Sequence, residues 1–165
     1  MYYARGGDSM NCSAQGEGCG VLLKSGYPVV DAVSPDSCLA RMQQLNPQRN
    51  GEPRKPERLC AGQTLLCRSL DIRVPDWNAQ GFNADTLLIE DDGYHPEQVI
   101  QAARLGIPSG RDEHLPYRWV DAAYAAHCTR NPLGRSRKPG HDYHLLEHDT
   151  ALRSAVSGVP PCSQA

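Results

Sequence analysis

The segment at residues 43–67, QQLNPQRNGEPRKPERLCAGQTLLC, restricts the possible fold more than any other part of this chain. An apolar helical segment has to end at Asn46-Pro47, because proline lacks a backbone N–H and restricts the residue before it. A polar loop follows over residues 48–58, and residues 59–66 then predict a strand interrupted at Gly62. Helix, stop, loop and strand in this order indicate a small unit that mixes helices and strands.

The residues before this segment predict one strand and two helices. Residues 2–5, YYAR, favour a short strand that is followed by a turn at Gly6-Gly7. Asp8-Ser9 is a good N-cap for a short first helix. Ser34-Pro35 predicts the start of a second helix. The apolar face of this second helix consists of Leu39, Met42 and Leu45.

The remaining sequence predicts strands first and helices later. Residues 70–93 contain the strand-like segments LDIRV and TLLIEDDG. The later segments EQVIQAARL, YRWVDAAYAAHC and DYHLLEHDTALRSAV are typical of helices and are separated by loops. We therefore expect an α+β protein in two parts, with a small unit at residues 1–70 and a β-then-helical region at residues 71–165.

Charge and hydropathy exclude several classes of protein. The formal net charge is −2, whereas a general nucleic-acid binder carries a clear excess of basic residues. No apolar run reaches the roughly eighteen residues of a membrane span, and residues 1–8 lack the apolar core of a signal peptide. We therefore expect no nucleic-acid partner, no membrane span and assembly in the cytoplasm, with a secreted or cell-wall protein as the alternative.

Seven cysteines are many for a chain of 165 residues. No Cys-x-x-Cys pair is present, which argues against a zinc ribbon. Two interpretations remain open for these cysteines. They are either small buried thiols, because free cysteine often packs as a small apolar residue, or a disulfide framework.

The N-terminal motifs, taken in order, resemble the LysM domain over residues 2–67. That family begins with a tyrosine-led strand and Gly-Asp-Ser/Thr-Leu, to which GDSM at residues 7–10 is similar. Its second helix ends in Leu-x-x-Leu-Asn-Pro, which MQQLNP at residues 42–47 resembles. It closes with Leu-x-x-Gly-Gln-x-Leu, which LCAGQTL at residues 59–65 matches. The resemblance implies a βααβ unit with an insertion between its two helices.

LysM domains are typically binding modules for glycans that contain N-acetylglucosamine, such as peptidoglycan or chitin. They bind in a shallow groove between the loop after the first strand and the loop after the second helix. Carried over to this sequence, the resemblance implies a glycan-binding groove made of Gly7, Asp8, Ser9, Met10, Asn46, Pro47 and Gln48. A second interpretation is that Asp8, Asn46 and Pro47 are purely structural caps.

The resemblance also implies a biological setting. LysM-like modules occur as protein–protein adaptors in phage tails and baseplates, which are assembled in the cytoplasm without signal peptides. We therefore expect a non-enzymatic structural component of a phage-tail-like particle (a baseplate or tail-hub protein of the virion), or a binder of peptidoglycan glycan. Its partners would be that glycan or neighbouring structural proteins, and it would need no cofactor.

A competing hypothesis is a LysM-targeted peptidoglycan hydrolase with a zinc site. His144-Leu-Leu-Glu147-His148 fits His-x-x-Glu-His, a motif typical of zinc peptidases. On a helix, His144 and His148 would lie one turn apart and could bind zinc, with His141 as a further candidate ligand. Glu147 would then activate a metal-bound water as the catalytic base. Residues 150–165, however, contain no Asp or Glu to supply the downstream acidic ligand.

Other segments have both a structural and a functional interpretation. The acids in IEDDG, residues 89–93, either carry out acid–base chemistry on sugars or cap the end of a strand. Residues 95–119 are compatible with a helix-turn-helix. The second helix of that motif would, however, carry few basic residues, Arg111 and Arg118, which argues against DNA readout. The basic loop at residues 131–140 favours a solvated surface or a protein contact.

Overall fold

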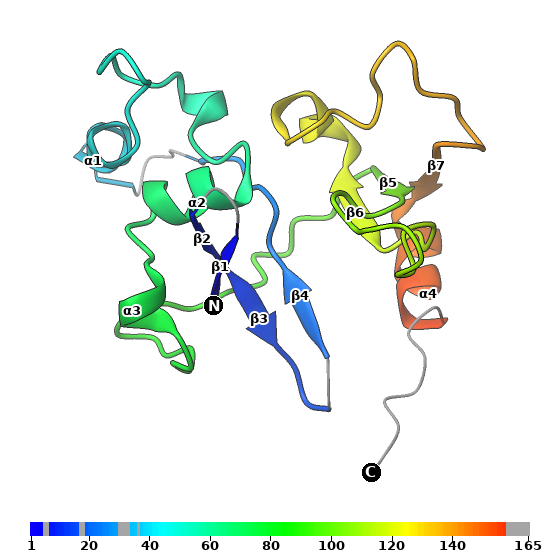
Figure 1. Cartoon of the computed structure of the whole chain (residues 1–165), viewed down its shortest axis with the longest axis horizontal. Helices are drawn as coiled ribbons and strands as arrows, with labels where there is room; N and C mark the ends of the chain where they lie inside the picture. The colour runs from blue at the N-terminus through cyan, green and yellow to red at the C-terminus, as the bar shows by residue number, and fades with distance from the viewer. Residues whose placement is uncertain (5–6, 17–18, 30–33, 36, 158–165) are drawn as a thin grey trace. The chain divides into compact units, whose positions relative to one another are not determined.

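The computed structural model describes residues 1–4, 7–16, 19–29, 34–35 and 37–157, in two compact units (Figure 1). Among the described residues, the first unit consists of residues 1–89 and 127–129, and the second of residues 90–126 and 130–157. The first unit thus extends past residue 70, the boundary expected from the sequence. Both units contain helices and strands. None of the helices in the described residues has the length and apolar character that crossing a bilayer requires.

Two β-hairpins form the N-terminal part of the first unit. β1 (Tyr2–Ala4) pairs antiparallel with β2 (Gly7–Ser9), and β3 (Asn11–Ser13) pairs antiparallel with β4 (Gly20–Leu22). The helix predicted from Asp8-Ser9 is therefore wrong. Ser9 and Met10 are 0% and 6% exposed, and their burial between paired strands outweighs the local preference of Asp-Ser for a helix N-terminus.

Short helices complete the first unit. They are α1 (Ser37–Leu45), the 3₁₀-helix η1 (Pro56–Arg58), α2 (Gln63–Ser69) and α3 (Val74–Trp77). The predicted helix end at Asn46-Pro47 is confirmed, because α1 stops at Leu45. The strand predicted at residues 59–66 is wrong, because the chain enters α2 immediately after Gly62.

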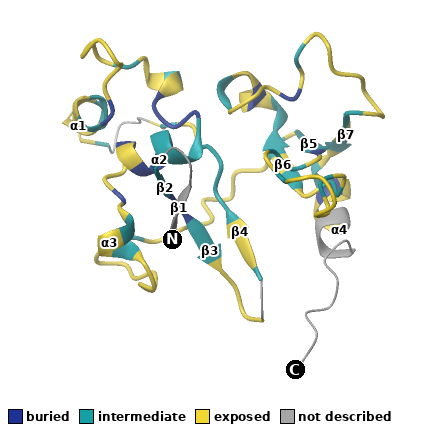
Figure 2. Cartoon of the chain, viewed as in Figure 1, coloured by how far each residue is buried: buried dark blue, intermediate teal, exposed yellow. Residues whose placement is uncertain are grey.

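Among the described residues of the first unit, buried apolar side chains form two clusters, and Figure 2 marks the buried positions along the chain in dark blue. One contains Met10, Cys67 and Ile72, and the other contains Leu59, Cys60 and Leu66. Leu23 packs against both clusters. Cys60 and Cys67 are free thiols, and burial raises the pKa of each. The buried-thiol interpretation is therefore confirmed for these two cysteines.

The side chain of Asn46 joins the end of α1 to α2 and to the segment before it. It is 0% exposed. Its Nδ2 donates to the carbonyl oxygens of Leu59 and Leu65 at 2.9 and 3.2 Å. It also donates to Ser69 Oγ at 3.1 Å, and the Ser69 hydroxyl in turn donates to the Leu59 carbonyl at 2.9 Å. Asn46 is therefore a structural residue, because its amide satisfies buried carbonyl groups that water cannot reach.

We expect Asn46→Ala to lower the free energy of unfolding by about 1–3 kcal/mol, because it leaves buried acceptors without their donor. Urea denaturation followed by circular dichroism would measure this loss. Gln48→Ala is the matched control, since Gln48 is exposed and its side-chain Nε2 donates to the nearby Pro53 carbonyl at 3.0 Å. Equal midpoints for the two variants would contradict the structural role of Asn46.

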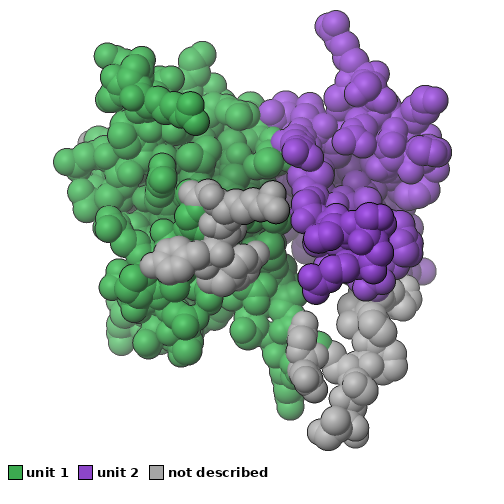
Figure 3. Space-filling model, viewed as in Figure 1, with its two compact units in different colours: residues 1–89, 127–129, 163–165 green, residues 90–126, 130–162 purple. Residues whose placement is uncertain are grey.

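The second unit, purple in Figure 3, contains a three-stranded antiparallel sheet. β5 (Gln98–Ala102) lies between β6 (Arg118–Asp121) and β7 (Tyr143–Glu147). The 3₁₀-helix η2 (Ala122–His127) follows β6, and α4 (His148–Ser157) follows β7. The buried apolar residues of this part are Ile100, Ala102, Ala125 and Ala151.

The helices predicted for the second unit are mostly wrong. EQVIQAARL contains the central strand β5, YRWVDAAYAAHC begins with β6, and only the second half of DYHLLEHDTALRSAV is helical. Val99 and Ile100 are β-branched, and β5 gains backbone hydrogen bonds from both neighbours. Pairing across the sheet therefore overrides the helical spacing of the apolar residues. The helix-turn-helix considered for residues 95–119 is excluded for the same reason.

Candidate functional site

The residues expected to form a glycan groove are largely occupied by structural contacts. Ser9, Met10 and Asn46 are buried, so a sugar would find no exposed surface on their side chains. Asp8 Oδ1 accepts a hydrogen bond of 2.8 Å from the backbone N–H of Val74, the first residue of α3. These contacts support the capping interpretation that the sequence left open.

The remaining groove candidates belong to a loop that is bonded within itself. Gln48 donates to the Pro53 carbonyl, and Arg54 Nη2 donates to the Pro47 carbonyl at 2.8 Å. Arg54 Nε also donates to the Asn46 carbonyl at 3.2 Å. Gly7 has a φ of +127°, and a Cβ there would come within 3.0 Å of the Thr64 side chain. Glycine is therefore needed for conformation and space.

The histidines of the His-x-x-Glu-His motif do not share one helix. His144 and Glu147 lie on β7, whereas His148 is the first residue of α4. His148 stacks edge-on against His95, with ring centroids 4.7 Å apart. His141 Nδ1 lies 3.4 Å from a carboxylate oxygen of Asp142. Among the residues that the structure describes, no three His, Cys, Asp or Glu side chains come together to hold a metal ion.

We expect the protein with His144→Ala and His148→Ala to hold the same amount of zinc as the wild type, below one ion per chain. The strand geometry of β7 separates the two imidazoles that a shared helix would have brought together. Elemental analysis after dialysis against zinc measures this directly. One zinc per wild-type chain, lost in the double variant, would restore the zinc-peptidase hypothesis.

The acids of IEDDG form turns. Asp91 Oδ1 accepts a hydrogen bond of 2.9 Å from the N–H of Gly93, and Asp92 Oδ1 accepts one of 2.9 Å from the N–H of Tyr94. Glu90, Asp91 and Asp92 are all exposed. The capping interpretation of these acids therefore fits the structure, and the carboxylate pair is not placed in a cavity.

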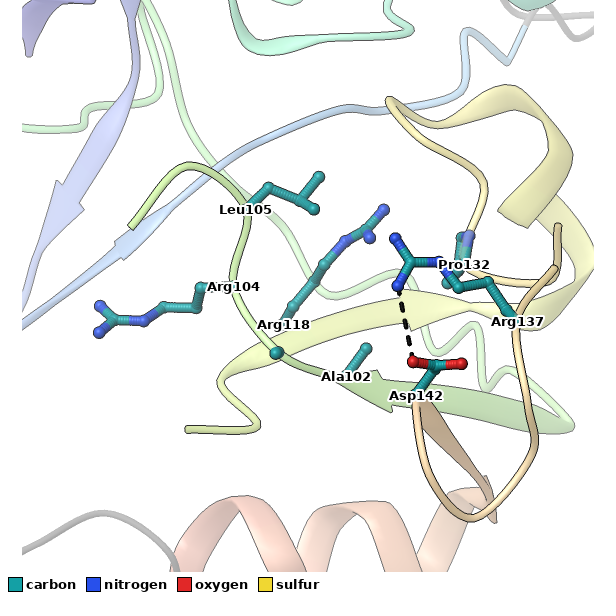
Figure 4. Close-up of a pocket in the computed structure, with 8 residues that line it drawn as sticks. Ala102, Arg104, Leu105, Arg118, Pro132, Arg137 and Asp142 are labelled. Carbon is teal, nitrogen blue, oxygen red and sulfur yellow. Dashed lines mark ion pairs between the residues drawn. The ribbon is translucent and has the colours of Figure 1, made fainter. Parts of the chain in front are cut away.

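A cavity of about 160 Å³ in the second unit is lined by three arginines (Figure 4). Its walls are residues 102–105 at the end of β5, Arg118 at the start of β6, and Pro132, Arg137 and Asp142 from the loop before β7. The sheet register brings these segments together, because Ala102 lies opposite both Arg118 and Tyr143. The basic loop at residues 131–140 thus contributes a wall of this cavity.

Asp142 organises the loop wall of the cavity. Its Oδ2 accepts a hydrogen bond of 2.7 Å from the N–H of Lys138, and this bond is the main reason that the pKa of Asp142 is lowered. Burial opposes the effect, while His141 and Arg137 add to it. The Arg137 guanidinium lies 3.7 Å from the carboxylate, too far for a hydrogen bond. Asp142 is therefore held by backbone, whereas Arg137 is only loosely held by Asp142.

The two other arginines are held by different partners. Arg118 Nη2 donates to the Arg130 carbonyl at 2.9 Å. The Arg104 guanidinium lies 5.8 Å from the ring centroid of Tyr117, within the range of a cation–π interaction. Its Nε is buried and finds no hydrogen-bond partner among the described residues. Figure 4 shows Arg118 and Arg137 pointing toward one another, while Arg104 points away from both.

The loop from β5 to β6 contains a carboxylate bonded to the backbone. Glu113 accepts hydrogen bonds of 3.0 Å from the Ser109 hydroxyl and the Gly110 N–H, and one of 3.1 Å from the Arg111 N–H. Its own backbone N–H and that of Gly110 contribute most to lowering the pKa of Glu113 to about 2. The ionised carboxylate therefore fixes a turn that carries positive φ at Gly110 and Asp112.

We expect Glu113→Gln to reduce the loss of stability that the protein shows in acid. The folded-state pKa is lowered, so the stabilisation is present above the ordinary glutamate value of 4.5 and is lost as the pH falls from there towards 2. Urea midpoints measured at pH 7 and pH 3 give the change for each protein. Glu97→Gln, at an exposed position, is the control. An equal acid-induced shift in wild type and Glu113→Gln would contradict this role.

The cavity combines three cationic side chains with one carboxylate, so it can hold an anion. Guanidinium groups present planar, paired donors that match carboxylate and phosphate oxygens.

The family model of methylpurine-DNA glycosylase matches residues 1–125. A "Putative 3-methyladenine DNA glycosylase" of Pseudomonas aeruginosa (strain UCBPP-PA14) is 62% identical over 148 residues, which cover 90% of this chain and 62% of the relative. The same name belongs to a Pseudomonas fluorescens (strain Pf0-1) protein, 60% identical over 146 residues, covering 88% of this chain and 63% of that protein. A Pseudomonas savastanoi pv. phaseolicola protein of the same name is 58% identical over 147 residues, which cover 89% of this chain and 66% of that protein.

The chain therefore belongs to the methylpurine-DNA glycosylase family. It spans 62% of the length of the Pseudomonas aeruginosa relative. Proteins of this family typically work without a cofactor, in agreement with the cofactor prediction.

Family membership overturns the LysM resemblance of residues 2–67. Three predictions that depended on this resemblance are therefore wrong: the phage-tail adaptor, the peptidoglycan binder and the LysM-targeted hydrolase. The exclusion of a nucleic-acid partner is also wrong, because this family acts on DNA. That exclusion depended on the net charge of the whole chain, which hides the local excess of basic residues at 130–140.

The sequence indicated one wall of the arginine cavity, the basic loop, but not the cavity itself. The basic loop at residues 131–140 was the available signal, and it was interpreted as a solvated surface or a protein contact. Arg118 was considered only as part of a helix-turn-helix, and Arg104 carried no signal of its own. The register of β5 places these residues around one cavity, and sequence spacing does not reveal that register.

Proposed function

We propose that the protein acts as a DNA glycosylase that removes methylated purines, 3-methyladenine among them. The observation that carries the proposal is the 62% identity over 90% of this chain to a relative named for that activity. Because the chain spans 62% of that relative, the activity of the whole protein is part of the proposal. Its place of action would be the compartment that holds the DNA.

The proposed reaction is hydrolysis of the bond between the damaged purine and deoxyribose C1′. Water adds to C1′, the C1′–N9 bond breaks, and the bonding electrons leave with the purine. Methylation at N3 gives the purine ring a positive charge, so the base departs as a neutral molecule. The proton of the attacking water passes to a general base. The product is free base and an abasic site in the DNA.

An enzyme of this kind has to take the damaged nucleotide out of the base stack, at a cost of a few kcal/mol. Contacts with the phosphate backbone supply the sequence-independent binding that offsets this cost. Damage occurs in any sequence, so backbone contacts suit the task better than base-edge readout. The cationic cavity and the exposed basic residues of the 131–140 loop are compatible with such contacts.

We expect the full chain to release 3-methyladenine from DNA treated with a methylating agent and to release no base from untreated DNA. Chromatography of the released bases measures the excision. Binding to a duplex with a stable abasic-site analogue, measured by fluorescence anisotropy, tests recognition separately. Binding without release would overturn the catalytic part of the proposal, and absence of both would overturn the whole proposal.

A further inference from the structure

We propose that the arginine cavity of the second unit is a binding site for one phosphate of the DNA backbone. The inference rests on the proposed function, because it names how this unit would contact that substrate. Arg118 and Arg137 would be the phosphate ligands, and Arg104 a positioning residue.

The charge and size of the cavity fit a phosphate group. Arg118 and Arg137 converge on a cavity of about 160 Å³ whose lining contains one carboxylate, Asp142, so one of these two positive charges is left uncompensated. The space is large enough for a phosphate group or for several waters. Arginine pairs with phosphate oxygens through parallel N–H bonds, which is stronger and more directional than contact with a single lysine ammonium.

Arg118 and Arg137 approach the cavity from separate elements. Arg118 starts β6, and Arg137 lies in the loop before β7. Their guanidinium groups point toward one another in Figure 4, so a phosphate between them would be held from two sides. Arg137 is 48% exposed, and its distance of 3.7 Å from Asp142 is longer than a hydrogen bond. It can therefore turn to a phosphate without breaking a strong contact.

The carboxylate of Asp142 would make phosphate binding in this cavity weaker and reversible. Its main hydrogen bond goes to the Lys138 backbone, and its lowered pKa keeps it ionised at neutral pH. A phosphate entering the cavity would compete with this fixed carboxylate for Arg137. The competition weakens binding of a lone anion, so the site would act as one of several backbone contacts.

Arg104 forms part of the cavity wall. Its guanidinium lies over Tyr117, and it points away from the other two arginines in Figure 4. Arg104 and Leu105 both line the side of the cavity at the end of β5. We therefore assign direct phosphate contact to Arg118 and Arg137 alone.

The source of the phosphate follows from the surroundings of the cavity. Arg135 and Lys138 are exposed in the same loop as Arg137, so positive charge continues along the loop beyond the cavity. A continuous phosphate backbone can use such a row of charges, whereas a free phosphate ion occupies one position. DNA is therefore the ligand that fits both the cavity and its flank.

The test compares Arg137→Gln with Arg135→Gln, since both remove one charge from the same exposed loop and only Arg137 lines the cavity. The affinity of the full chain for a duplex with an abasic-site analogue is measured at several salt concentrations. We expect the slope of log K against log salt to become less steep by about 0.9 in Arg137→Gln, the value for one phosphate contact. Arg135→Gln removes a flanking charge but no cavity ligand, so it should change the slope less than Arg137→Gln does.

Asp142→Asn should change DNA affinity in the direction opposite to Arg137→Gln. The amide oxygen still accepts from the Lys138 N–H, while the competing negative charge is gone, so DNA affinity should rise.

Equal slopes for wild type, Arg137→Gln and Arg135→Gln would overturn the phosphate site while the proposed function stands. A wild type without DNA affinity would overturn the proposed function itself. Inorganic phosphate alone, added during ³¹P NMR, should bind only weakly, and binding as tight as that of the duplex would overturn DNA as the source.

Discussion

The pairing of β5 with strands on both of its sides is the constraint on which the candidate site depends. Ala102 lies opposite Arg118 on one side and opposite Tyr143 on the other. This register brings the start of β6 beside the loop that ends at Asp142, although the two are distant in sequence. A slip of one residue would turn the side chains of a strand to the opposite face of the sheet. The cavity therefore depends on this register, in which the central residue Ile100 is fully buried.

A slightly acidic net charge does not conflict with membership of a family that acts on DNA. The sequence has 17 basic and 19 acidic residues, but a phosphate responds to the field at its own position. Residues 130–140 carry four basic side chains and no acid, whereas Glu90, Asp91 and Asp92 lie together in a separate turn. Total charge is thus a poor guide to partners when each sign is concentrated in its own segment.

The same local chemistry can serve unrelated folds, and this accounts for the LysM resemblance. Asn46-Pro47 ends a helix because proline cannot continue it, and Asp8 accepts a backbone N–H at the start of α3. Such caps and stops specify where an element ends, and they occur wherever a chain needs that geometry. The hydrogen bonds of Asn46 to Leu59, Leu65 and Ser69 show the specific use made here. Motifs built from turn residues therefore predict local structure far better than they predict family.

By itself, the sequence determined the features that depend on neighbouring residues. These are the end of the helix at Asn46-Pro47 and the start of that helix shortly after Ser34-Pro35, because proline and the capping residues act on their immediate neighbours. Only the tertiary structure decided that residues 98–102 and 143–147 are strands, because their stability comes from partners about twenty and forty residues away. It also decided that three arginines with no common spacing surround one cavity. Side chains meet according to sheet register and loop path, and neither can be read from the order of the residues alone.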